Sequence, residues 1–185
     1  MITLPNAISV FRLVASPFVF LLAYRDMFLE SAVLFLLLAV SDAVDGALAR
    51  LMKAQTTLGK ILDPLADKSL LLFGLASITF HTDVRSSYVL FKLLMMRDIL
   101  LVGGSLFLRR FGFVPEPSPL GKATTFFLSV TVSMGFLANL SPEGLVLSLF
   151  RWSQSISLAL IVLSGIDYTA KGINFLLGKF IMERR

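Results

Sequence analysis

Long apolar stretches separated by short polar segments follow one another along the whole chain. A membrane-spanning helix needs roughly 20 mostly apolar residues, and each stretch is about that long. We therefore predict six transmembrane helices, near residues 6–24, 31–51, 58–80, 87–108, 120–139 and 147–177. The predicted fold class is all-α, a polytopic membrane protein in which residues 1–185 form a single transmembrane domain.

The first apolar stretch opens with polar and turn-forming residues. It begins Leu4-Pro5-Asn6 and then places Arg12 among apolar neighbours. This favours a short N-terminal interfacial segment, from which the aliphatic stem of Arg12 would carry its charge to the headgroups. No basic segment precedes the stretch and no small-residue cleavage site closes it, so we expect it to stay in the mature protein.

Composition supports the membrane assignment and narrows the chemistry. Of the 185 residues, 56% are hydrophobic and only 16% are charged, with a mean hydropathy of +0.84. The chain has no cysteine and one histidine, His81, which excludes disulfides, thiolate metal sites and multi-histidine zinc sites. Any bound metal must therefore be held by oxygen.

The formal net charge of +5 reflects the membrane rather than nucleic acid, because no run of five or more basic residues occurs. Basic residues concentrate after the second, fourth and sixth predicted spans, which predicts that these connections and both termini are cytoplasmic. The ten residues there are Arg50, Lys53, Lys60, Arg109, Arg110, Lys122, Lys171, Lys179, Arg184 and Arg185. The other connections hold three, namely Arg25, Arg85 and Arg151.

Four aspartates cluster at the junction of the second and third spans. Asp42 and Asp45 are three residues apart, and Asp63 and Asp67 are four apart, so each pair lies on one face of its helix. An aspartate at the centre of a span costs about 3 kcal/mol, so acids in spans usually line a cavity or serve a function. Two antiparallel helices would bring all four carboxylates into one cleft at the cytoplasmic face.

Such a cleft predicts a divalent metal site. Four unpaired carboxylates would repel one another, and carboxylates without Cys or His favour a hard cation such as Mg²⁺, Mn²⁺ or Ca²⁺. Because Mg²⁺ usually completes its shell with phosphate oxygens, a diphosphate is the natural co-ligand. Small residues, Gly46, Ala49 and Gly59, would let a ligand approach the backbone, and Arg50 offers a forked phosphate donor.

Simpler explanations exist for some of these residues. Asp63 before Pro64 could only cap a helix, and Gly and Ala often serve helix packing in membranes. Capping explains neither Asp42 nor Asp45, however, and packing explains no carboxylate. A small cation transporter is the alternative from another class, but the acids cluster at one membrane face and no second acidic series completes a route.

The eight residues just described resemble the signature of the CDP-alcohol phosphatidyltransferase family. The motif reads Asp42-x2-Asp45-Gly46-x2-Ala49-Arg50-x8-Gly59-x3-Asp63-x3-Asp67. The resemblance implies transfer of a phosphatidyl group from CDP-diacylglycerol to an acceptor hydroxyl, with release of CMP and with two Mg²⁺ or Mn²⁺ ions. It also implies a homodimer in the bacterial inner membrane, with the active site facing the cytoplasm.

The resemblance further assigns roles to residues. Asp42, Asp45 and Asp63 would bind metal, and Asp67 would both contact the metal site and act as the general base. The cytidine diphosphate pocket would be lined by Gly46, Ala49, Arg50 and Gly59.

Finer resemblances favour glycerol 3-phosphate as the acceptor, with phosphatidylglycerol as the alternative. They are Leu4-Pro5-Asn6-Ala7-Ile8-Ser9-x2-Arg12, the stretch Leu62 to Lys68, Arg97-Asp98, and Pro117-Ser118-x2-Gly121-Lys122-x2-Thr125. The candidate ligands of the acceptor phosphate are Arg97, Arg109, Arg110 and Lys122. Arg109 and Arg110 could instead be positive-inside anchors, and Arg97 could form an internal ion pair with Asp98. Tyr168 is expected to anchor the membrane interface.

Overall fold

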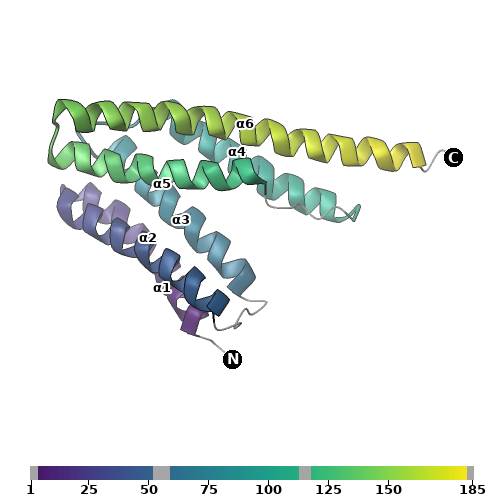
Figure 1. The fold of residues 1–185 in the computed structure, drawn as a ribbon, viewed down its shortest axis with the longest axis horizontal. Helices are drawn as coiled ribbons and strands as arrows, with labels where there is room; N and C mark the ends of the chain where they lie inside the picture. The colour runs from purple at the N-terminus through teal and green to yellow at the C-terminus, as the bar shows by residue number, and fades with distance from the viewer. Residues whose placement is uncertain (1–3, 52–58, 113–117, 183–185) are drawn as a thin grey trace.

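The computed structural model describes residues 4–51, 59–112 and 118–182, with side chains for 7–41, 59, 62–112 and 118–178. Within these residues the protein is all-helical (Figure 1). The helices are α1 (Leu4–Tyr24), α2 (Phe28–Leu51), α3 (Gly59–Phe80), α4 (Tyr88–Arg109), α5 (Pro119–Leu140) and α6 (Gly144–Met182). Each one matches a predicted apolar stretch to within about three residues at its ends, except that α6 continues to Met182 where the sequence predicted an end near 177.

Three of the described helices are long and apolar enough to cross a membrane. The apolar segments are Ala7–Tyr24 in α1, Pro119–Leu140 in α5 and Gly144–Gly178 in α6, and α2 contributes a shorter one, Phe28–Ser41. Helices α3 and α4 are continuous, but charged residues interrupt their apolar sequences, among them Asp67 in α3 and Arg97 in α4. The charges in these two helices mark the part of the bundle where chemistry is expected.

The helices form two groups that share one core. In Figure 1, α5 and α6 run side by side, and α1, α2 and α3 form the group beneath them, with α4 against α6. Phe35 of α2, Ile78 of α3 and Val132 and Phe136 of α5 are among the buried residues that join the groups. At Gly74 a Cβ atom would lie 2.7 Å from Phe35 Cε2 and 2.8 Å from Val132 Cγ1, so three helices cross closely there.

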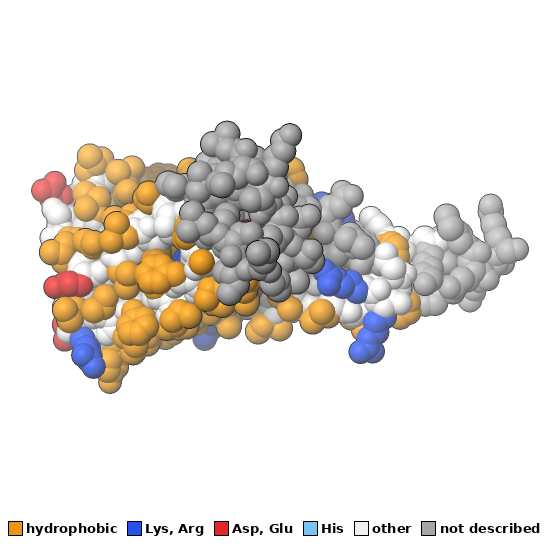
Figure 2. Space-filling view, turned by 90° about the horizontal axis from the view of Figure 1, so that it is seen from below, with side chains coloured by type: hydrophobic (Ala, Val, Ile, Leu, Met, Phe, Trp, Pro, Cys, Tyr) orange, Lys and Arg blue, Asp and Glu red, His pale blue; other side chains and the backbone are white. Residues whose placement is uncertain are grey.

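The connections that follow α1, α3 and α5 meet at one end of the bundle (Figure 1). Four exposed acids, Asp26, Glu30, Asp83 and Glu143, lie in or beside these connections, and Figure 2 shows acidic side chains gathered at this end. The side-chain amide of Asn139 donates to the Val84 carbonyl at 3.0 Å and accepts from the Val84 amide at 2.9 Å. These bonds attach the α3–α4 connection to the end of α5.

The first helix differs from the prediction at Arg12. Helix α1 is continuous from Leu4 to Tyr24 and its apolar segment begins at Ala7, so an interfacial position of its first residues stays a prediction. Arg12 is 1% exposed, so the expectation that its side chain reaches the headgroups was wrong. It turns into the bundle, where an acidic partner on α3 compensates its charge.

Candidate functional site

The first turns of α3 carry the two acids whose side chains are described. Asp63 is exposed, and the Asp67 side chain is 40% exposed. Their spacing of four residues places them one turn apart on the same face of α3. Both carboxylates are therefore open to a ligand that approaches this end of the helix.

Helix α1 supplies a hydrogen-bond donor to each of these acids. The Ser9 hydroxyl donates to Asp63 Oδ1, and Arg12 Nη1 forms an ion pair with Asp67 Oδ1. Both donors are about 1% exposed. Sequence reasoning missed these contacts, although a charged residue inside an apolar helix is a signal that an opposite charge lies nearby.

The other two acids of the motif lie in the last three turns of α2. Asp42 and Asp45 are helical there, as are Gly46, Ala49 and Arg50, but these five side chains lie outside the described part of the structure. The connection from α2 to α3 covers residues 52–58, so the eight steps from residue 51 to residue 59 span at most about 29 Å. Helices α2 and α3 are in contact, whereas the convergence of all four carboxylates stays a prediction.

The described acids suit a hard divalent cation. Among the residues with described side chains, no group of three or more potential metal ligands occurs, and Asp63 and Asp67 contribute two carboxylates of the predicted four. Metal-binding carboxylates usually accept further hydrogen bonds that orient them, as Asp63 and Asp67 do from α1. Gly59, a predicted pocket residue, is buried at the start of α3.

A second polar network links α3, α4 and α6 next to these acids. Arg97 is 7% exposed, and its Nη1 donates to Asp98 Oδ1 at 3.0 Å while its Nε donates to Ser164 Oγ at 3.1 Å. Lys68 Nζ, adjacent in sequence to Asp67, lies 3.6 Å from the same Asp98 oxygen. The internal ion pair considered for Arg97 is therefore present.

The other three candidate ligands of an acceptor phosphate lie in a different environment from Arg97. Arg109 and Arg110 are exposed at the end of α4, and Lys122 is exposed in the first turn of α5. Arg97, in contrast, is buried in the bundle. The structure therefore does not place the four in one common environment.

Tyr168 has a role that the sequence did not reveal. Its hydroxyl accepts a hydrogen bond from the Ser118 amide at 3.4 Å, and the Ser118 hydroxyl in turn accepts from the Gly121 amide at 3.0 Å. A Cβ atom at Gly121 would lie 3.3 Å from both of these hydroxyl oxygens. Tyr168 therefore contacts the start of α5, next to Lys122, rather than only anchoring an interface.

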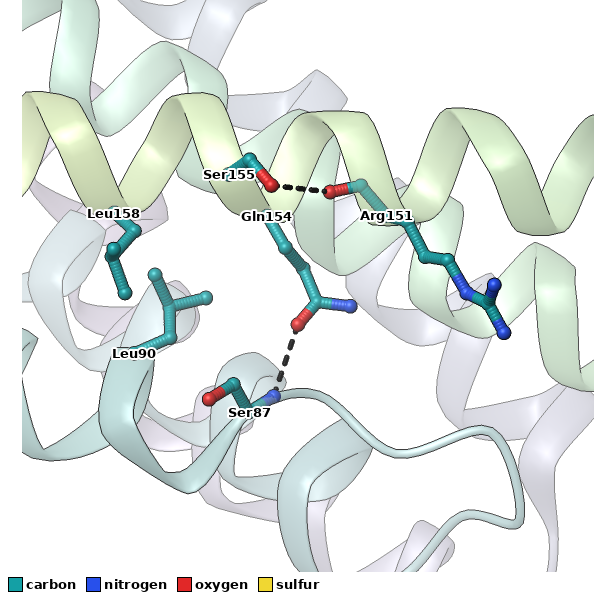
Figure 3. Close-up of a pocket in the computed structure, with 6 residues that line it drawn as sticks. All are labelled: Ser87, Leu90, Arg151, Gln154, Ser155 and Leu158. Carbon is teal, nitrogen blue, oxygen red and sulfur yellow. Dashed lines mark hydrogen bonds between the residues drawn. The ribbon is translucent and has the colours of Figure 1, made fainter.

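A pocket of about 320 Å³ lies elsewhere in the bundle, between the start of α4 and α6. Figure 3 shows the Ser87 amide donating to Gln154 Oε1 (3.0 Å) while the Arg151 guanidinium points away from Ser155. None of the residues that line this pocket belongs to α3, the helix that carries Asp63 and Asp67. Its lining contains no carboxylate, so it does not suit a cation.

Comparison with known proteins decides the family. The family model described as CDP-alcohol phosphatidyltransferase matches residues 2–166. The chain belongs to the CDP-alcohol phosphatidyltransferase family. All eight motif positions of this phosphatidyltransferase, from Asp42 to Asp67, fall within the matched region.

Two curated relatives of this phosphatidyltransferase match nearly its whole length, and a third matches three quarters of it. A CDP-diacylglycerol–glycerol-3-phosphate 3-phosphatidyltransferase of Aquifex aeolicus is 40% identical over 172 residues, which cover 93% of this chain and 97% of the relative. A Bacillus subtilis protein of the same name is 30% identical, covering 92% and 95%. A cardiolipin synthase (CMP-forming) of Streptomyces coelicolor is 34% identical, covering 75% and 66%.

Proposed function

We propose that this protein transfers the phosphatidyl group of CDP-diacylglycerol to glycerol 3-phosphate, which forms phosphatidylglycerophosphate and releases CMP. The observation that carries the proposal is the 40% identity, over nearly the full length of both chains, to the Aquifex aeolicus relative named for this reaction. The eight-residue motif and the open acids at the start of α3 support the same chemistry.

In the proposed reaction one bond forms and one breaks at a single phosphorus. A hydroxyl oxygen of glycerol 3-phosphate bonds to the phosphorus that carries diacylglycerol, and the bond from that phosphorus to CMP breaks, so CMP leaves with the electron pair. Asp67 takes the hydroxyl proton as general base. The pocket for the cytidine diphosphate is formed by Gly46, Ala49, Arg50 and Gly59.

The proposed cofactor is a pair of Mg²⁺ or Mn²⁺ ions. Asp42, Asp45, Asp63 and Asp67 would hold the ions, whose charge would offset the diphosphate and the charge that develops on the departing CMP. On α3, Asp63 is exposed and the Asp67 side chain is 40% exposed, as access for a metal ion requires.

For the acceptor phosphate we propose Lys122 as the leading ligand, with Arg109 and Arg110 nearby in sequence and Arg97 deeper in the bundle. Lys122 is exposed at the start of α5, where the Ser118–Gly121–Tyr168 contacts hold the backbone. Glycerol 3-phosphate is a dianion, so a cationic side chain beside the metal ions would favour its binding.

The proposed setting is the bacterial inner membrane, crossed by all six helices. The active site faces the cytoplasm, both termini are cytoplasmic, and the protein is a homodimer. The distribution of basic residues supports this orientation, because cytoplasmic connections are enriched in Lys and Arg. Ten basic residues lie in or beside the segments that follow α2, α4 and α6, against three in the other connections.

The test is the identity of the lipid product. Purified protein receives CDP-diacylglycerol, Mg²⁺ and either glycerol 3-phosphate or phosphatidylglycerol, and the lipids are identified by mass spectrometry. We expect phosphatidylglycerophosphate and one CMP per product molecule. Cardiolipin formed from phosphatidylglycerol, with no product from glycerol 3-phosphate, would favour the activity that names the Streptomyces coelicolor relative.

A further inference from the structure

Helix α1 contacts both described acids of the site through two side chains one helical turn apart. Ser9 and Arg12 are three residues apart on α1, and they donate to Asp63 and Asp67, which are four apart on α3. We propose that Ser9 and Arg12 are positioning residues that fix the two carboxylates for metal binding and proton transfer. This inference rests on the proposed function and makes α1 the third helix of the active site.

Burial is the first support for this role. Ser9 and Arg12 are each 1% exposed, whereas Asp63 is exposed and the Asp67 side chain is 40% exposed. The donors are thus buried inside the bundle, whereas the carboxylates that they contact are partly accessible from outside it. A ligand can reach the acids without displacing either donor.

The chemistry of the two donors is the second support. A carboxylate on an exposed helical turn has several rotamers, and a hydrogen bond to one of its oxygens selects among them. The planar guanidinium of Arg12 offers donors in fixed directions, so it can hold the carboxylate of Asp67 in one orientation. Asp67 needs a fixed orientation because it is proposed both to face a metal ion and to receive a proton. The Ser9 hydroxyl is neutral, so it orients Asp63 without adding a positive charge beside the proposed cation.

Helix packing is the third support. Helices α1 and α3 are in extensive contact, and the Ser16 hydroxyl, one turn beyond Arg12, donates to the Arg12 carbonyl at 2.6 Å within α1. Ser16 is fully buried like Ser9, yet its hydrogen bond stays inside its own helix. Ser16 is therefore a matched control for Ser9.

The experiment compares Ser9→Ala, Arg12→Gln and Arg12→Lys with Ser16→Ala. Mn²⁺ affinity is measured without substrate by electron paramagnetic resonance, and kcat and KM for CDP-diacylglycerol are measured from CMP release. Changing a residue that orients a metal ligand typically lowers metal affinity or activity about 10- to 100-fold. We expect such a loss of Mn²⁺ affinity in Ser9→Ala, and a comparable loss of kcat in Arg12→Gln that Arg12→Lys partly restores. Ser16→Ala should match the wild type in both.

The opposite result is equally clear. If Ser9→Ala and Arg12→Gln keep the wild-type Mn²⁺ affinity and kcat while only their melting temperatures fall, the contacts serve folding and the inference is overturned. If Arg12→Gln does not fold, Ser9→Ala decides the question, since it removes one hydroxyl. A wild-type protein that binds Mn²⁺ but makes no phosphatidylglycerophosphate would contradict the proposed acceptor alone, because the affinity measurement needs no substrate.

Discussion

Asp67 has two proposed roles, as a metal ligand and as the general base, and it also contacts Arg12. The substitution Asp67→Asn tests the role as base while an oxygen that can contact Arg12 stays in place. Asparagine keeps the shape of the side chain and an oxygen that can accept from Arg12, but its amide cannot take a proton. General-base catalysis contributes roughly 10²- to 10⁴-fold, so Asp67→Asn should lower the rate of CMP release by about that factor. A variant with an unchanged melting temperature and the full wild-type rate would remove Asp67 as the base.

Lys122 tests the acceptor side of the site independently. A hydrogen bond to a charged group contributes about 1.5–3 kcal/mol, so Lys122→Ala should raise the KM for glycerol 3-phosphate roughly tenfold or more. The KM for CDP-diacylglycerol should stay near the wild-type value. Lys92→Ala is the control, because Lys92 is also exposed but lies in the second turn of α4, near the opposite end of the bundle. Equal effects of both variants on the acceptor KM would contradict a specific role for Lys122.

At the residue scale, local spacing was predictable and distant partners were not. Asp63 and Asp67 share a face because four residues make about one turn, a property of any helix. The partner of Arg12 depends on how α1 packs against α3, 55 positions away in sequence. The sequence did indicate the pairing of Arg97 with Asp98, since those residues are adjacent.

At the scale of helices, we expect a substitution at Gly74, where α2, α3 and α5 cross, to disturb their packing. Leucine at Gly74 would collide with Phe35 and Val132. Overpacking of this kind costs about 1–3 kcal/mol, so Gly74→Leu should lower the melting temperature of the purified protein. Gly103→Leu is the matched control, because nothing lies within 4 Å of a Cβ atom there and both variants gain the same helix propensity. A Gly74→Leu protein as stable as Gly103→Leu would show that the three helices do not pack this closely.

The helices themselves were the most predictable feature. Apolar backbone in a membrane must satisfy its own hydrogen bonds, so an apolar stretch of this length is helical almost regardless of its neighbours. The end of α6 was predicted less well because no proline or turn motif marks it, and the helix runs on to Met182. At the other end of the chain, Leu4-Pro5-Asn6 has the composition of a break, yet these residues are helical because Pro5 is tolerated in the first turn of α1.

At the scale of the whole molecule, orientation can be tested because the chain has no native cysteine. Single cysteines replace exposed residues, Asp83→Cys and Glu143→Cys at the end that holds the α3–α4 and α5–α6 connections, and Ala170→Cys in the last third of α6. A membrane-impermeant maleimide applied to intact spheroplasts should label positions 83 and 143, and should label position 170 only after permeabilisation. The reverse pattern would place the acids of α3 on the outer side and contradict a cytoplasmic active site.

The central claim is that acids from α2 and α3 hold the same divalent ions. The most direct measurement is a Mn²⁺ titration of the purified protein, of Asp45→Asn on α2, of Asp63→Asn on α3 and of the double variant. We predict about two Mn²⁺ ions per wild-type chain, loss of high-affinity binding in each single variant, and no substantial further loss in the double variant. Wild-type Mn²⁺ affinity and stoichiometry in either single variant would contradict the claim.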